Sequence, residues 1–338
     1  MTQIRKTRLH SLIFCTMIGF VTAFAVIRTQ KSNTPPPVVQ FVHSPLGDYL
    51  YLLFNRKTLS DHPDIDSLAG IRDLATLEEL IALPEIVISL QINTYAEIYP
   101  VLDRFYKNAR STTLHDPFPK KLGFGEQLPS YDTILALIKA GEPHFNRFDS
   151  LWQQLILPAI ILQTNTWKKQ LTDLRVLENY QRLTRLTLKT DTLQIGALAY
   201  HLAGSANYHP TGIYTSLFKT PNLPWVIGHE GTHLLLTGPA GMNWMQSPRV
   251  AKLTKLATLR ETSLYELEEA MCHFMQAQLS KSCGTKPADF PIASRYEKGM
   301  LQELLVYWET NWPQYLAGKT TIIDFMIQGG EVVWKQQR

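Results

Sequence analysis

The segment from Pro224 to Thr237 restricts the possible folds of this chain more than any other part of it. It is apolar on nearly every side of the helix that it predicts. Pro221 and Pro224 are typical of a helix start, and Gly238-Pro239 is typical of a helix end. A helix that is apolar all round lies buried inside a domain. The rest of the chain must therefore cover this helix and supply partners for its few polar side chains.

Those polar side chains form the pattern H-E-x-x-H, with His229, Glu230 and His233. Helix positions four apart lie about 40° apart around the axis, so both imidazoles project from one face and can bind one metal ion. Glu230 follows the first histidine, where its carboxylate can take a proton from a water on that ion. This arrangement is typical of zinc-assisted hydrolysis of amides. A fortuitous pair of core histidines is the alternative interpretation.

A catalytic zinc site needs a third protein ligand and leaves one position for water. The next strong helix is predicted from Ser263 to about Leu279, and Glu266 has the capping-box spacing from its first residue. Glu269 and His273 lie together on the side away from the apolar face, which is either solvated or the wall of a polar cleft. Glu269 is the preferred third ligand, and Glu268, at the edge of the apolar face, is the alternative.

An H-E-x-x-H motif followed by a glutamate on a later helix resembles the gluzincin metallopeptidases, the group of thermolysin and the aminopeptidases. In that group the ligand glutamate stands in a segment of the form Asn-Glu-Ala/Gly-apolar-x-polar-aromatic or apolar, which residues 268–274 match. The resemblance implies that His229, His233 and Glu269 bind Zn²⁺. It also implies that Glu230 is the catalytic general base.

The match has departures. The Asn position is occupied by Glu268, and the Asp that thermolysin-like enzymes place behind the zinc ligands falls at His273. Residues 234 to 268, which are 35 positions, separate the two motifs. The resemblance further implies a tyrosine or histidine that donates a hydrogen bond to the oxyanion. The candidates are His273, Tyr296 and Tyr307.

Strand-like segments precede the H-E-x-x-H helix. Leu186–Lys189 and Thr192–Ile195 alternate apolar and polar residues, and Thr190-Asp191 between them fits the turn of a hairpin. Gly212–Phe218 reads as another strand. A small sheet at this place is what the gluzincin resemblance implies, with an edge strand that pairs with the substrate backbone.

The amino terminus indicates where the chain works. Arg5, Lys6 and Arg8 precede an uncharged, mostly apolar run over residues 11–27. This pattern is typical of a signal anchor or a signal peptide, and Ala23-Phe24-Ala25 resembles a cleavage site. We expect the domain either anchored in the membrane on its extracytoplasmic (periplasmic or extracellular) side, or secreted after cleavage behind Ala25. Residues 28–40, with three consecutive prolines, predict a spacer.

Helical periodicity dominates the rest of the chain. We expect an α+β fold, a mostly helical zincin-like catalytic domain with a small sheet beside the H-E-x-x-H helix. A mainly helical lobe is expected at residues 41–180 and the catalytic lobe at 181–338. The segments with helix-like spacing are Leu74–Leu83, Thr94–Arg110, Tyr131–Ala140, Asp149–Thr166 with an interruption or a kink at Pro158, Leu301–Trp308 and Thr321–Gln328.

Charge content bears on the class of partner, and cysteine content bears on a possible disulfide. Lys+Arg number 33 against 29 for Asp+Glu, with no basic stripe, so nucleic acid is not expected as a partner. Cys15 falls in the amino-terminal apolar run. Cys272 and Cys283 predict either a disulfide, as an oxidising compartment allows, or a buried and an exposed free thiol.

These features favour a zinc-dependent peptidase that acts on a peptide or protein substrate outside the cytoplasm. Two alternatives stay open. One is a non-catalytic membrane-anchored scaffold or binding protein with a structural or vestigial H-E-x-x-H. The other is a zinc amidase for a non-protein amide, such as a cell-wall crosslink. The intact Glu230 favours an enzyme over a scaffold, because a structural site has no use for a base at that position.

Overall fold

The computed structural model describes residues 36–335, apart from 56–69, 71–73, 75–82, 110–128, 187, 189, 201–205, 209–211, 217–221, 238–242, 287–299 and 319. The predicted anchor or signal segment and most of the predicted spacer lie outside the described residues. Within the described part of the chain, no helix has the length and apolar character needed to cross a bilayer.

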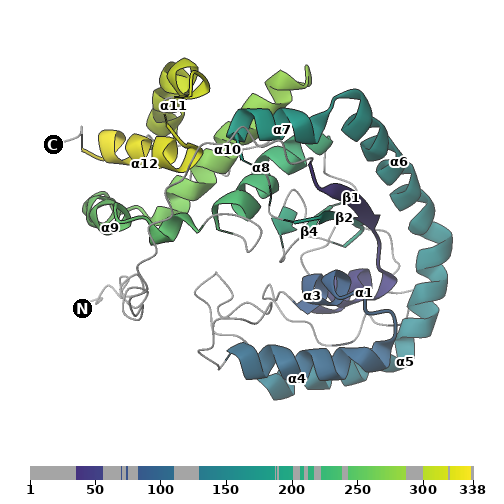
Figure 1. Cartoon of the computed structure of the whole chain (residues 1–338). Coiled ribbons are helices and arrows are strands. Elements are labelled where there is room, and N and C mark those ends of the chain that lie inside the picture. The colour runs from purple at the N-terminus through teal and green to yellow at the C-terminus, as the bar shows by residue number, and fades with distance from the viewer. Residues whose placement is uncertain are drawn as a thin grey trace, which may run out of the picture.

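The fold is α+β and mostly helical, as predicted. The helices are α1 (Pro45–Asn55), α3 (Leu83–Ser89), η2 (Tyr95–Glu97), α4 (Ile98–Ala109), α5 (Tyr131–Leu155), α6 (Leu157–Asp173), α7 (Val176–Thr184), α8 (Leu223–Leu236), η3 (Trp244–Gln246), α9 (Val250–Leu259), α10 (Leu264–Ser282), α11 (Met300–Leu316) and α12 (Ile322–Val333). In Figure 1 the small sheet lies between α1, α3 and α4 on one side and α7, α8 and α10 on the other. Helices α5 and α6 run around the outside from one group to the other.

The sheet has the strand order β1-β2-β4-β3. Strands β1 (Val38–Val42), β2 (Thr192–Leu198) and β4 (Gly212–Ser216) are parallel, and the short β3 (Ala206–Tyr208) pairs antiparallel with β4 at the edge. Ile195 of β2 stands opposite Phe41 of β1 and Ile213 of β4. The predicted strand at Gly212–Phe218 is therefore confirmed over most of its length.

The predicted hairpin before the H-E-x-x-H helix is wrong. Residues 186 and 188 are not in a strand, and β2 begins only at Thr192. Both edges of β2 are paired in parallel, one with β1 and the other with β4, so an antiparallel partner has no free edge to join. The partner that replaces it, β1, includes residues 38–40, which the sequence assigned to the spacer. The sheet thus takes strands from both sides of the predicted lobe boundary near Tyr180, and the division into lobes stays a prediction.

The two helices that carry the candidate site agree with the sequence. Every residue of α8 is buried, and Asn222 caps it by accepting a hydrogen bond from Trp225 N at 2.9 Å. Helix α10 begins with the predicted capping box, in which Ser263 Oγ accepts from Glu266 N and Glu266 Oε2 accepts from Ser263 N. These caps fix where each helix starts, and hence which residues reach the space between them.

Other predicted helices are confirmed in part. Residues 149–166 are interrupted and not kinked: they form the end of α5 and the first part of α6, with the break at Ile156 and Pro158 in the first turn of α6. The predicted helix Leu74–Leu83 lies mostly outside the described residues. Four predictions match observed helices over their described parts, namely Thr94–Arg110, Tyr131–Ala140, Leu301–Trp308 and Thr321–Gln328.

The possible disulfide between Cys272 and Cys283 does not form. Both are free thiols, and both are buried, so the prediction of an exposed thiol at Cys283 is wrong too. Cys272 lies within α10 and Cys283 caps its end. Eleven residues of helix rise by about 16 Å, whereas a disulfide needs Cα atoms about 4.4–6.8 Å apart.

Candidate metal centre

Helices α8 and α10 come into backbone contact beside the site. A Cβ on Gly228 would lie 2.6 Å from Gln276 Cα and 3.1 Å from Gln276 N, both backbone atoms of α10. At Gly231 a Cβ would meet Tyr180 no closer than 3.5 Å, an ordinary contact. Only Gly228 is therefore needed for the close approach that brings α10 side chains over the histidines of α8.

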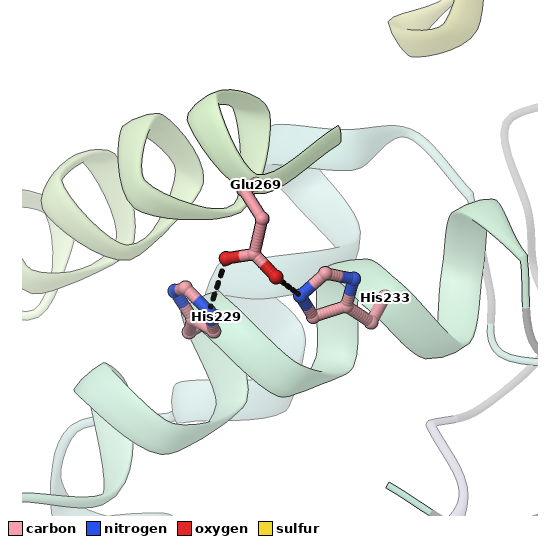
Figure 2. A group of neighbouring side chains, drawn as sticks. All are labelled: His229, His233 and Glu269. Carbon is pink, nitrogen blue, oxygen red and sulfur yellow. Dashed lines mark ion pairs between the residues drawn. The ribbon is translucent and has the colours of Figure 1, made fainter. Parts of the chain in front are cut away.

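The side chains of His229, His233 and Glu269 converge between these two helices (Figure 2). Glu269 reaches from α10, and its two oxygens face one imidazole each. Glu269 Oε2 lies 3.5 Å from His229 Nε2, and Glu269 Oε1 lies 3.2 Å from His233 Nε2. One ligand atom from each residue lies within 4.8 Å of the other two.

This donor set fits a zinc ion. Two ligands at about 2.1 Å from a tetrahedral zinc lie about 3.4 Å apart. Each imidazole is at about this distance from a Glu269 oxygen, His229 from Oε2 and His233 from Oε1. Two imidazole nitrogens and one carboxylate are also the ligand types that zinc takes in catalytic sites. The three residues could hold the ion together and leave a fourth position for water.

Glu268 lies on the other side of His233. Its Oε1 accepts a hydrogen bond from His233 Nδ1 at 2.8 Å and one from Thr237 Oγ1 at 3.0 Å, while its Oε2 accepts one from Trp244 Nε1 at 2.7 Å. An ionised carboxylate only accepts, so the proton of the neutral ring belongs on Nδ1 and leaves Nε2 as the free donor atom. The structure thus brings Glu269, and not Glu268, between the two histidines.

Glu230 is buried next to the group. Its Oε1 lies 3.8 Å from His229 Nε2, and its side chain is almost fully covered. Burial raises the pKa of the Glu230 carboxyl and Glu269 adds to the rise, whereas His229 and His233 oppose it. A carboxylate with a raised pKa is a stronger base than one in water.

The three ligand candidates influence one another electrostatically. Burial raises the pKa of Glu269, but its contacts with His229 and His233 outweigh burial and hold that pKa below its ordinary value. Burial lowers the pKa of His233, but its contacts with Cys272, Glu268 and Glu269 outweigh burial and raise that pKa. These two shifts describe a buried pair of a Glu269 carboxylate and a His233 imidazolium, in which a bound cation would have to take the place of the proton on His233.

The predicted oxyanion donors fall in different places. His273 lies on α10 beside His229, with ring centroids 4.6 Å apart, so the structure brings it to the group. Burial and the neighbouring His229 lower the pKa of His273 to about 4, so its ring is neutral at pH 7. Tyr307 lies on α11 and lines a surface hollow with Val333 of α12, away from the group. Tyr296 lies outside the described residues.

Sequence reasoning missed the residues that surround the two imidazoles. Trp225, one turn before His229, stacks on its ring with centroids 6.0 Å apart and planes 11° apart. Trp244 and Thr237 hold Glu268, which was considered only as a ligand. Thr237 stands four residues after His233, a helical spacing that predicts the two side chains to be neighbours. Trp244 lies beyond the end of α8, and no local pattern pointed to it.

Comparison of the chain with models of protein families, with curated proteins and with solved structures gives no match in any of the three.

Proposed function

We propose that this protein is a zinc-dependent peptidase that hydrolyses peptide bonds outside the cytoplasm. The observation that supports it most is the convergence of His229, His233 and Glu269, with Glu230 beside them. All four side chains belong to residues that are only 4–9% exposed. Buried polar groups need partners, which a shared metal ion would provide. A purely structural metal site would have no use for the basic carboxylate of Glu230 beside the three ligands. The finer fold assignment, a zincin-like catalytic domain, is part of this proposal.

The proposed chemistry assigns a separate task to each residue. His229, His233 and Glu269 would hold the zinc ion, which would supply Lewis acidity to lower the pKa of water and to polarise a carbonyl. Glu230 takes the proton of the water that attacks the carbonyl carbon and passes it to the leaving amine. His273, neutral at pH 7 and next to His229, is the best placed of the three candidates to donate a hydrogen bond to the developing oxyanion.

The proposed location and partners come from the amino terminus. The basic residues before the apolar run at 11–27 support export, with that run retained as an anchor or cleaved after Ala25. The partners in this proposal are a peptide or protein substrate and, through the anchor, the membrane. Nucleic acid is not among them.

The test combines metal analysis with a peptide library. Purified full-length protein is analysed for metals alongside Glu269→Ala and alongside Glu309→Ala, a control in an exposed ion pair with Lys281. We expect one zinc per chain in the wild type and the control, lost in Glu269→Ala, together with zinc-dependent cleavage of quenched-fluorescence peptides.

A folded wild-type protein without metal would refute the proposal. Zinc without cleavage of any peptide would favour the scaffold. Cleavage of cell-wall crosslinks but not of peptides would favour the amidase.

A further inference from the structure

We propose that Glu268 is the positioning residue of the metal centre. Its carboxylate fixes the ring of His233 and adds a negative charge that strengthens ion binding. This inference rests on the proposed function, because it assigns a task to a residue behind the same ligands. Glu268 itself does not face the space between the two histidines.

Glu268 is built into the fold more firmly than an ordinary helix carboxylate. It is 4% exposed, although it lies on α10 among residues that the sequence placed at the edge of an apolar face. Three donors from three different places in the chain converge on it, namely the imidazole of His233 in α8, the hydroxyl of Thr237 just after α8 and the indole of Trp244 in η3. Both carboxylate oxygens are used, so a charged group at this depth is fully hydrogen-bonded.

Among the residues described, the ring of His229 has no outer hydrogen-bond partner of the kind that Glu268 provides for His233. Within the part of the chain that the structure describes, His229 Nδ1 is buried and has no hydrogen-bond partner. Its ring is held by aromatic contacts instead, with Trp225 stacked on it and His273 edge-on. Among the described residues, a carboxylate is hydrogen-bonded to Nδ1 of His233 but not to Nδ1 of His229. Outer partners of this type fix the tautomer and raise the basicity of the ligand, so the two histidines are unequal ligands.

Because three donors bind Glu268, variants can separate the effect of its negative charge from the effect of its hydrogen bonds. Glutamine has one acceptor oxygen and an amide that only donates, so Glu268→Gln sets an N–H group against at least one of the three donors. Trp244→Phe removes the indole donor. The double variant Glu268→Gln/Trp244→Phe therefore keeps an acceptor for His233 and Thr237 but lacks the charge.

The experiment measures the zinc dissociation constant of the full-length chain by chelator competition. We expect Glu268→Gln to weaken zinc binding by about 10- to 100-fold, the range for loss of an outer partner. The double variant should bind more tightly than Glu268→Gln but more weakly than Trp244→Phe alone, because the charge is still missing. Glu309→Gln, exposed on α11, is the matched control and should bind zinc as the wild type does.

A second readout does not depend on affinity. With ¹⁵N-labelled histidine, NMR should show a slowly exchanging proton on His233 Nδ1 in the wild type, and this proton should be lost in Glu268→Ala. Zinc binding by Glu268→Gln equal to the wild type, or an unchanged Nδ1 proton in Glu268→Ala, would overturn the inference and leave the proposed function standing. A wild type that binds no zinc would instead overturn the proposed function, and this inference with it.

Discussion

Glu268 and Glu269 are neighbours in the chain, yet they hold opposite sides of one imidazole. Glu269 faces His233 Nε2 at 3.2 Å, and Glu268 accepts from His233 Nδ1 at 2.8 Å. Two carboxylates of the same type therefore have different proposed tasks, one as a ligand and the other as the group that orients a ligand. Which of the two faces the histidines is set by the rotation of α10 about its own axis, since adjacent residues point about 100° apart.

The variant Glu230→Gln separates metal binding from catalysis. The glutamine side chain fills nearly the same volume but its amide cannot accept the proton, so we expect the variant to keep its zinc and its fold. Hydrolysis should fall by about 10²- to 10⁴-fold, the usual contribution of a general base. Turnover of a cleaved peptide, measured together with zinc content, checks this. Full activity in the zinc-loaded variant would contradict the proposed role.

Asp48 gives a prediction on pH. It is fully buried and accepts hydrogen bonds from Trp152 Nε1 and Tyr200 N. Burial raises its pKa to about 7, although these bonds oppose the rise. Between about pH 4 and pH 7 the folded chain holds a proton that the unfolded chain has released, so the free energy of unfolding falls as the pH rises.

Asp48→Asn removes this titration. We expect the variant to gain stability relative to the wild type between about pH 5 and pH 8, by a few kcal/mol in all. Urea unfolding of both proteins at about pH 5 and about pH 8 gives the difference in free energy of unfolding between variant and wild type at each pH. An equal difference at both values would show that Asp48 does not titrate in this range.

At the scale of elements, the contact between α8 and α10 is the feature that creates the centre. Gly228→Ala places a methyl group 2.6 Å from the backbone of Gln276, which cannot move aside as a side chain can. We expect this change to destabilise the fold by about 1–3 kcal/mol, the usual cost of overpacking, and to weaken zinc binding by separating the helices. Denaturant unfolding and zinc titration measure the two effects.

Gly231→Ala is the matched control, one turn away on the same helix. Its methyl group would make an ordinary contact with Tyr180, and alanine favours a helix over glycine by about 1 kcal/mol. We expect unchanged zinc binding and equal or greater stability. If both alanine variants behaved alike, close approach at Gly228 would not be what positions α10.

The sequence predicts a feature well when the residues that determine it lie close together in the chain, and poorly when they lie far apart. The starts of α8 and α10 follow from proline, capping and periodicity signals within a few residues, and the choice of Glu269 followed from a local motif. The pairing of β1 with β2 joins residues 38–42 to 192–196, and no local alternation contains it. The task of Glu268 was missed for the same reason, because Trp244 reaches it from beyond the end of α8.

For the whole molecule, an ion shared by α8 and α10 would add to the stability of the fold. An ion that binds only the folded chain stabilises it by about 2.7 kcal/mol when its free concentration is 100 times the dissociation constant. We therefore expect zinc to raise the melting temperature of the metal-free wild type and a chelator to reverse the shift. Scanning calorimetry should show no such shift in Glu269→Ala, and an equal shift there would place the ion elsewhere.

The parallel pairing of β1 with β2 also bears on the order of folding. About 150 residues separate the two strands, and loop closure over such a span is slow compared with local helix formation. Strand β1 is synthesised before α5, α6 and α7, and its partner β2 only after them. Until then β1 is an unpaired, largely apolar strand, the kind of segment that holdase chaperones bind. We therefore expect refolding of the sheet to be slow and dependent on protein concentration, whereas local helix–coil relaxation is fast.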